Sequence, residues 1–295
     1  MRQFPSHPIH PNRTPKRPPF MDILSQTPPR ADHRIPYGKD ENQFGDLWLP
    51  HDTRTKAPVV VFLHGGWWQS TYDLAYTGFL ADDLRNHGIA VWSIEYRRLG
   101  NPGAGYPGTF LDVANAFEFT RTLAATYPLA LDRVITSGHS AGGHLAFWLA
   151  GRHHIPETSP LATPKPGLAV HAAISLAGVV DLRLTRDLAS GWIFSHDKPL
   201  VDAVMGGSPE EVPDHYRAGN PGDLLPLGVP QFLVQGNEDN QIAPDLPVRY
   251  ATNARAQHDT VSVTIIPGAD HFDIVDPTSR AWPTIRDIYR KACFS

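Results

Sequence analysis

The sequence has one cysteine, Cys293, and no long apolar run. One cysteine cannot form an internal disulfide, which fits a reducing compartment, and its place near the carboxyl end argues against a catalytic thiol. No apolar stretch approaches the roughly 18 residues of a membrane-spanning helix, and the amino-terminal region has no apolar core typical of a secretory signal. We therefore expect a cytoplasmic protein without a membrane partner, in which Cys293 is incidental.

The chain also lacks an excess of basic charge. It has 26 Lys and Arg against 30 Asp and Glu, a formal net charge of -4 over 295 residues, and no long basic run. This balance favours neither nucleic acid nor an anionic membrane as a partner. We expect a small-molecule substrate, and homodimer formation is left open.

Residues 1–35 have no apolar periodicity and are rich in proline and basic residues, so we predict a disordered tail there. More ordinary sequence begins at Phe20, and translation starting at Met21 is an alternative that amino-terminal sequencing of the native protein would test. Residues 36–295 are enough to bury a large core, and we expect them to form a single domain.

Short apolar runs alternate with helical patterns from Gln43 onward. Most of the runs are continuous rather than alternating, which is typical of strands that helices cover on both faces. The sequence therefore predicts the α/β class, with a doubly wound, mainly parallel sheet. The predicted strands are Gly45–Leu49, Pro58–Leu63, Ala90–Ile94, Arg133–Ser137, Ala172–Leu176, Gln231–Val234 and Val261–Ile266, and the predicted helices are Tyr76–His87, Thr109–Tyr127, Gly143–Gly151, Pro247–Gln257 and Thr284–Ala292.

The segment from Asp181 to Gly228 is too long for a simple crossover between strands. It holds little strand pattern and is broken repeatedly by proline and glycine. We predict an inserted cap at about 182–228. Such a cap would cover the carboxyl ends of the strands, where open α/β sheets place their ligands.

A nucleophile elbow is predicted at Gly138-His139-Ser140-Ala141-Gly142, between an apolar run and a helical pattern. A serine hydroxyl is a poor nucleophile at neutral pH, so the fold must expose it on a tight turn and place a base beside it. The pentapeptide alone is only suggestive, because chance produces it readily in a glycine-rich chain.

The base and the acid are predicted in loops that follow the last two strands. His271 follows the final strand and Asp239 the one before it, which gives the chain order Ser, acid, His. Asp239 would hold the imidazole in the productive tautomer, whereas the adjacent Glu238 would point elsewhere. Asp181 is the rival acid, but its surroundings read equally well as a turn in which it caps backbone amides.

Donors for the oxyanion are predicted in the loop His64-Gly65-Gly66-Trp67-Trp68. Paired glycines let backbone amides converge without obstruction, so we expect Gly65, Gly66 and Trp67 to act with the amide of Ala141. A plain glycine-rich turn would explain the two glycines but not the two tryptophans. Large apolar side chains in such a loop commonly line a pocket.

No metal site is predicted. His144, His153 and His154 lack the HExxH spacing of a zinc-binding helix. His139 flanks the nucleophile, where strand alternation points its side chain away from Ser140. It is nonetheless included among the pocket candidates.

Together these motifs resemble the α/β-hydrolases, and the HGGxW form of the oxyanion loop is similar to the kynurenine formamidase branch. Ser175–Leu182 and Asp270–Val275 agree with that branch, and the resemblance covers about residues 40–290. It implies cofactor-free hydrolysis of N-formylkynurenine to kynurenine and formate through a formyl-enzyme on Ser140. The acid loop, Asn240–Pro244, departs from the branch and resembles general esterases more.

We therefore expect a serine hydrolase of the kynurenine formamidase type, and a carboxylesterase of short-chain or aryl esters is the alternative. A formamidase needs an aromatic pocket, for which the candidates are Trp67, Trp68, His139, Trp192 and Phe194. The carboxylate of an amino-acid substrate would also need a cation, which Arg183 or Arg186 could supply. A third alternative is a non-catalytic binding protein that reuses the fold.

Overall fold

The computed structural model describes residues 23–52, 54–162, 167–189 and 197–295. Eight strands form one sheet in the order β1-β2-β4-β3-β5-β6-β7-β8. The strands are β1 (His33–Pro36), β2 (Phe44–Trp48), β3 (Ala57–Leu63), β4 (Ala90–Ile94), β5 (Leu129–His139), β6 (Ala172–Leu176), β7 (Gln231–Gly236) and β8 (Val261–Ile266). The pairs β1–β2 and β2–β4 are antiparallel and the other pairs are parallel.

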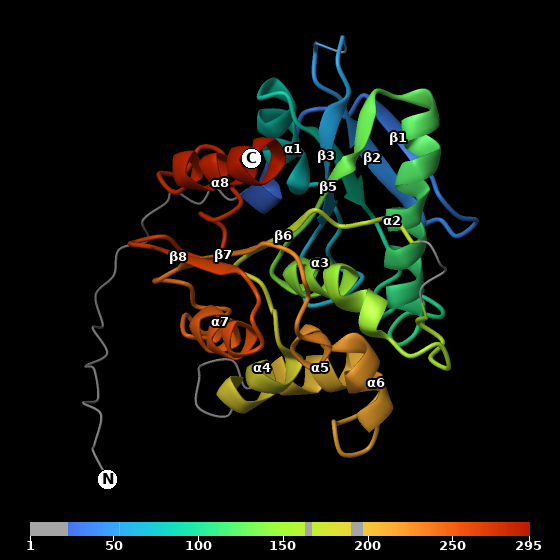
Figure 1. The fold of residues 1–295 in the computed structure, drawn as a ribbon, viewed down its shortest axis with the longest axis vertical. Helices are drawn as coiled ribbons and strands as arrows, with labels where there is room; N and C mark the ends of the chain where they lie inside the picture. Colours follow the sequence, from blue (N-terminus) through green and yellow to red (C-terminus); the bar gives the residue numbers. More distant parts are fainter. Residues whose placement is uncertain (1–22, 53, 163–166, 190–196) are drawn as a thin grey trace.

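Helices cover both faces of this sheet (Figure 1). They are α1 (Thr77–Asn86), α2 (Gly108–Thr126), α3 (Ala141–Gly151), α4 (Leu182–Ala189), α5 (Asp197–Met205), α6 (Pro213–Gly219), α7 (Leu246–Ala256) and α8 (Trp282–Phe294). Along β3, Val59 and Val61 belong to the apolar cluster that includes residues of α2, α3 and α7, whereas Val60 and Phe62 belong to the cluster that includes residues of α1 and α8. Every residue of β3 is buried, as expected for a central strand between two helical layers. The predicted doubly wound, mainly parallel sheet is confirmed.

The amino-terminal segment differs from the prediction of a disordered tail over residues 1–35. Residues 1–22 lie outside the described residues, but Ile23–Ser25 forms a short 3₁₀ helix whose Ile23 is buried among core residues of α1 and α8. β1 then pairs with β2. β1 has little signal in the sequence, because its four residues are exposed or half-buried and it ends in a proline.

The segment predicted as a cap is helical where it is described. It contains α4, α5, α6 and a short 3₁₀ helix at Pro221–Leu224, which gather beside α3 and α7 at the bottom of Figure 1. Asp181 precedes this segment and accepts hydrogen bonds from the amides of Arg183 (2.9 Å) and Leu184 (3.1 Å). Asp181 therefore caps α4, which removes it as the rival catalytic acid.

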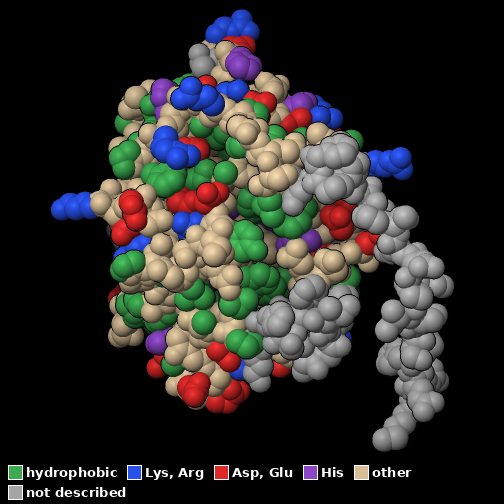
Figure 2. Space-filling view, turned by 180° about the vertical axis from the view of Figure 1, so that it is seen from behind, with side chains coloured by type: hydrophobic (Ala, Val, Ile, Leu, Met, Phe, Trp, Pro, Cys, Tyr) green, Lys and Arg blue, Asp and Glu red, His purple; other side chains and the backbone are tan. Residues whose placement is uncertain are grey.

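On the face shown in Figure 2, acidic and basic side chains are interspersed without a broad patch of one sign. Among the described residues, no helix is both long and apolar enough to cross a bilayer. The single cysteine, Cys293, is buried in α8, and burial raises the pKa of its thiol to about 12.

The strand-to-helix turn at the end of β5 depends on close backbone packing. A Cβ added to Gly142 would lie 2.0 Å from the carbonyl oxygen of Leu63. We expect Gly142→Ala to lower the free energy of unfolding by about 3 kcal/mol, the upper end of the usual cost of overpacking, because neither backbone segment can move away. Denaturant unfolding would measure this.

Gly268→Ala is the matched control for this substitution. Gly268 also lies in a loop at the same sheet edge, but an added Cβ would meet nothing within 4 Å, so only its φ of 73° opposes alanine, at about 1–2 kcal/mol. Equal losses in the two variants would show that backbone contact at Gly142 is not what constrains the turn.

Candidate active site

Ser140 occupies the turn between β5 and α3. Its φ of 54° and ψ of -122° take it out of the strand conformation, and the structure holds it there through its backbone. The Ser140 amide donates to the carbonyl of Leu176 (3.0 Å), and the Ser140 carbonyl accepts from Gly143 (2.9 Å) and Val179 (3.1 Å). Three hydrogen bonds thus hold Ser140 in a strained backbone conformation. A nucleophile elbow exposes its serine side chain through a turn of this kind.

His271 and Asp239 are brought together by their loops after β8 and β7. His271 Nδ1 lies 2.7 Å from Asp239 Oδ2, and both side chains are buried. The remaining ring nitrogen of His271 is thereby left for a second partner, and His271 lines the same cavity as Ser140. This is the arrangement in which a carboxylate orients an imidazole toward a serine.

The Asp239 carboxylate is hydrogen-bonded at both oxygens. Oδ2 also accepts from Gln235 Nε2 (2.7 Å), and Oδ1 accepts from the amides of Gln241 (2.8 Å) and Ile242 (2.9 Å). Burial acts to raise the pKa of Asp239, but the proximity of His271 and these hydrogen bonds outweigh it, and the net effect lowers the pKa. The carboxylate therefore stays ionised and able to stabilise a protonated His271.

The loop after β3 turns sharply at three consecutive residues. Gly66, Trp67 and Trp68 have φ values of 108°, 52° and 55°. Among the described residues, the amides of Gly66 and Trp67 donate no hydrogen bond within the chain. Ala141 is the first residue of α3, where helix geometry leaves the amide without an intrahelical acceptor. These three amides are therefore candidates to donate to an oxyanion.

The prediction that the Gly65 amide is an oxyanion donor is wrong. This amide donates to the hydroxyl of Tyr76 at 2.7 Å. Gly65 is instead required for space, because a Cβ there would lie 2.9 Å from the Cβ of Ser140. The oxyanion loop can approach the nucleophile this closely only with a glycine at this position.

His139 lies within the site rather than pointing away from it. Ser140 has left the strand conformation, so the alternation that predicted this orientation does not extend past His139. The hydroxyl of Tyr76 lies 2.9 Å from His139 Nδ1, and His139 Nε2 lies 3.1 Å from the carbonyl of His271. Burial, with the nearby His271, lowers the pKa of His139 to about 3, so the ring is neutral and donates from Nε2 only.

Tyr76 and His139 consequently join the three parts of the site in one directed chain of hydrogen bonds. Gly65 donates to Tyr76, Tyr76 donates to His139, and His139 donates to the backbone of His271. The oxyanion loop, the elbow and the base loop are therefore held in fixed relation to each other.

The cavity at Ser140 has a volume of about 190 Å³. Its walls are largely aromatic, and among the described residues none of them is an acid, a lysine or an arginine. It is lined by Leu24, Gly66, Trp67, Tyr72, Tyr76, His139, Ser140, Gln241, His271 and Phe272. Of these, Leu24, Tyr72, Tyr76, Gln241 and Phe272 were not predicted; Phe272 and Gln241 lie beside predicted loop residues, whereas nothing in the sequence indicated Leu24.

Two other pocket predictions are wrong. Trp68 is fully buried and packs edge-on against His144, so it belongs to the core. Arg183 is bound by Asp223 through both oxygens, at 2.9–3.1 Å, and does not line the cavity. Trp192 and Phe194 lie outside the described residues. Within the described residues, no three His, Cys, Asp or Glu side chains are grouped so as to hold a metal ion.

Comparisons with known proteins agree with this geometry. Over 261 residues the chain is 28% identical to esterase LipC of Mycobacterium tuberculosis, and the alignment covers 86% of this chain and 63% of LipC. It is 22% identical over 244 residues to the kynurenine formamidase of Salmo salar, and this alignment covers 82% of this chain and 75% of the formamidase. The chain thus spans less than two thirds of the length of LipC.

The fold is also shared with solved esterase structures. An inhibited esterase B from Lactobacillus rhamnosis superposes with a TM-score of 0.75 at 20% identity, over 88% of this chain and 84% of that one. The BD-FAE family model matches residues 45–251, which include Ser140 and Asp239. The chain therefore belongs to the BD-FAE family and to the esterase and formamidase branch of the α/β-hydrolases.

Proposed function

We propose that this enzyme hydrolyses esters and formamides that have a small acyl group and an uncharged aromatic leaving group, through Ser140, His271 and Asp239. The observation that carries the proposal is the buried Asp239–His271 pair at 2.7 Å, facing a small cavity that Ser140 shares. The mechanism follows from the roles that these side chains can play.

His271 accepts the proton of the Ser140 hydroxyl as the oxygen attacks the acyl carbon. The oxygen of the tetrahedral intermediate is stabilised by the amides of Gly66, Trp67 and Ala141. His271 then donates that proton to the leaving alcohol or amine, leaving an acyl-enzyme on Ser140. A water activated by His271 releases the acid and restores the free serine.

The cavity favours uncharged substrates. The amino-acid carboxylate of N-formylkynurenine would need a cation, and none is present among the described lining residues. Arg183 is bound by Asp223, and Arg186 forms an ion pair with Asp202 at 2.6 Å. We therefore favour short-chain or aryl esters over N-formylkynurenine.

Kynurenine formamidase activity is the second candidate. Its support is the aromatic wall made by Trp67, Tyr72, Tyr76 and Phe272, together with the similarity to the Salmo salar formamidase. A formyl group is the smallest acyl group, and it would fit the same small cavity.

The nucleophile is tested by replacing Ser140. We expect Ser140→Ala to reduce kcat for p-nitrophenyl acetate by at least about 10,000-fold, because no acyl-enzyme can form, with an unchanged unfolding transition. A fluorophosphonate probe should label the wild-type enzyme and not the variant. A wild-type protein that neither reacts with the probe nor hydrolyses the ester would favour a non-catalytic binding protein.

Substrate charge is tested by comparing kcat/KM for p-nitrophenyl acetate, formanilide and N-formylkynurenine. We expect the two neutral substrates to be cleaved, and N-formylkynurenine to have a kcat/KM at least about tenfold below that of formanilide, because its carboxylate would meet no cation among the described lining residues. A higher kcat/KM for N-formylkynurenine than for formanilide would instead support the kynurenine formamidase assignment.

Substrate size is tested at Leu24, which brings the amino-terminal segment to the cavity wall. We expect Leu24→Ala to raise kcat/KM for p-nitrophenyl hexanoate relative to the acetate by about tenfold, as removal of a few methylene groups from a pocket commonly does. Val248→Ala, an exposed apolar residue on α7 away from the cavity, is the control. The same acyl-length profile in both variants would contradict a role for Leu24.

A further inference from the structure

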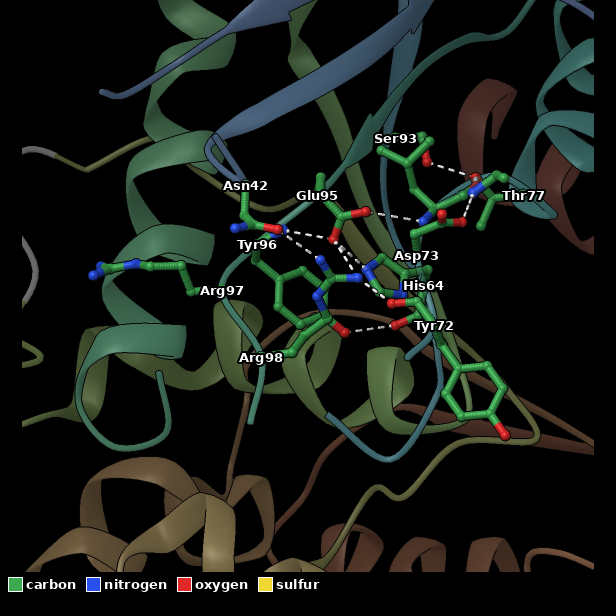
Figure 3. A network of polar contacts seen from close by, with 12 residues as sticks. Asn42, His64, Tyr72, Asp73, Thr77, Ser93, Glu95, Tyr96, Arg97 and Arg98 are labelled. Carbon is green, nitrogen blue, oxygen red and sulfur yellow. Dashed lines mark hydrogen bonds and ion pairs between the residues drawn. The ribbon is translucent and has the colours of Figure 1, made fainter. Parts of the chain in front are cut away.

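A buried carboxylate, Glu95, joins three segments behind the oxyanion loop (Figure 3). Glu95 directly follows β4 and is 2% exposed. Its Oε1 lies 2.9 Å from His64 Nε2 and 3.1 Å from the Arg98 guanidinium, and its Oε2 accepts the amide of Leu74 at 3.1 Å. Nothing in the proposed reaction uses this carboxylate, although burying it is costly.

His64 transmits the position of Glu95 to the oxyanion loop. Its Nε2 faces Glu95, and its Nδ1 lies 2.7 Å from the carbonyl oxygen of Gly65. The imidazole stacks on the ring of Tyr96 at 4.5 Å, and the Tyr96 hydroxyl donates to the His64 carbonyl at 2.8 Å. Both nitrogens of His64 therefore face oxygen atoms, so the ring is held between Glu95 and the Gly65 carbonyl.

The bond to the Gly65 carbonyl determines where the next amide points. In a trans peptide, the carbonyl oxygen of Gly65 and the N–H of Gly66 lie on opposite sides of the peptide bond. With the oxygen held on the His64 side, the N–H of Gly66 is directed to the other side, and Gly66 lines the cavity. The Gly65 amide is already bound by Tyr76, so the loop is fixed on both sides of the Gly65 residue.

The same cluster also fixes one wall of the cavity. Arg98 donates to the carbonyl of Tyr72 and, at 2.9 Å, to the side chain of Asn42. Tyr72 lines the cavity and backs directly onto the loop, because a Cβ on Gly66 would lie 2.4 Å from the Cβ of Tyr72. Glu95 thus contacts both His64, which supports the oxyanion loop, and Arg98, which supports the cavity wall at Tyr72.

We propose that Glu95 is a positioning residue for hydrolysis, which holds the ring of His64 in place and through it aims the oxyanion donors of Gly66 and Trp67 at the tetrahedral intermediate. This rests on the proposed function at Ser140.

The carboxylate form of Glu95 is the form that this role needs. Burial acts to raise the pKa of Glu95, but His64 and Arg98 outweigh it, and the net effect lowers the pKa. A glutamine of the same shape could accept from His64, but it would leave the buried Arg98 guanidinium without its carboxylate partner.

The test is Glu95→Gln, assayed with p-nitrophenyl acetate. We expect kcat to fall by about 10-fold to 100-fold while KM changes by less than about threefold, because oxyanion donors act on the transition state and not on the bound ester. Glu95→Asp keeps the charge and should recover part of the lost kcat. If Glu95 had only a structural role, Glu95→Gln would lower the midpoint of unfolding, but it would not lower kcat selectively while KM stays nearly unchanged.

Asp112→Asn is the matched control. Asp112 is also buried and binds the adjacent arginine, Arg97, through both oxygens at 2.6 and 2.7 Å, but it contacts neither the oxyanion loop nor the cavity. In Figure 3 the side chain of Arg97 points away from the cluster. We expect Asp112→Asn to destabilise the fold while leaving kcat within about twofold of the wild-type value.

The outcomes separate the inference from the proposed function. An active wild-type enzyme with an unchanged kcat in Glu95→Gln, or an equal loss of kcat in Asp112→Asn, overturns the positioning role alone. A wild-type protein inert to the ester and to a fluorophosphonate overturns both. If Glu95→Gln does not fold, His64→Gln carries the same test, since it disrupts the bond to Gly65 but leaves the Glu95–Arg98 pair, and full kcat in that variant overturns the inference.

Discussion

The parallel pairing of β3 with β5 is the constraint on which the rest of the site depends. Leu63 at the end of β3 lies opposite Gly138 at the end of β5, so the oxyanion loop and the elbow leave the sheet side by side. Gly142 then packs its backbone against the carbonyl of Leu63. A shift of one residue in this register would separate the amides that face the oxyanion from Ser140, since those amides lie on both segments.

The acid and base loops are joined by a similar close approach. A Cβ on Gly236, at the end of β7, would lie 2.2 Å from the carbonyl of Ala269, and the amide of Glu238 donates to that carbonyl at 3.0 Å. The imidazole of His271 is thus positioned by its own loop, by Asp239 and by His139. Catalytic geometry of this kind needs support from several directions, because small displacements of a base greatly lower its effectiveness.

Much of the sheet and of the site could be predicted because the signals are local. Three strands, β4, β6 and β8, have the bounds expected from their apolar runs, and the loops that hold Asp239 and His271 follow such runs directly. The contacts that join the loops are not local: Tyr76 lies at the start of α1, 63 residues from His139, and its hydroxyl has no sequence signature. For the same reason the sequence suggested Gly65 as a donor, since no pattern reveals that Tyr76 has taken its amide.

The charges around the site also show why sequence alone misplaced the substrate cation. Arg183 and Arg186 look available in the chain, but each is bound by an aspartate distant in sequence, and Arg98 is bound by Glu95. The described cavity wall is left uncharged. Under the proposed function, selection among substrates depends on shape, aromatic contact and the penalty for burying an unpaired charge. Backbone amides, held in place by the buried cluster behind the described wall, would stabilise an oxyanion in this cavity of about 190 Å³.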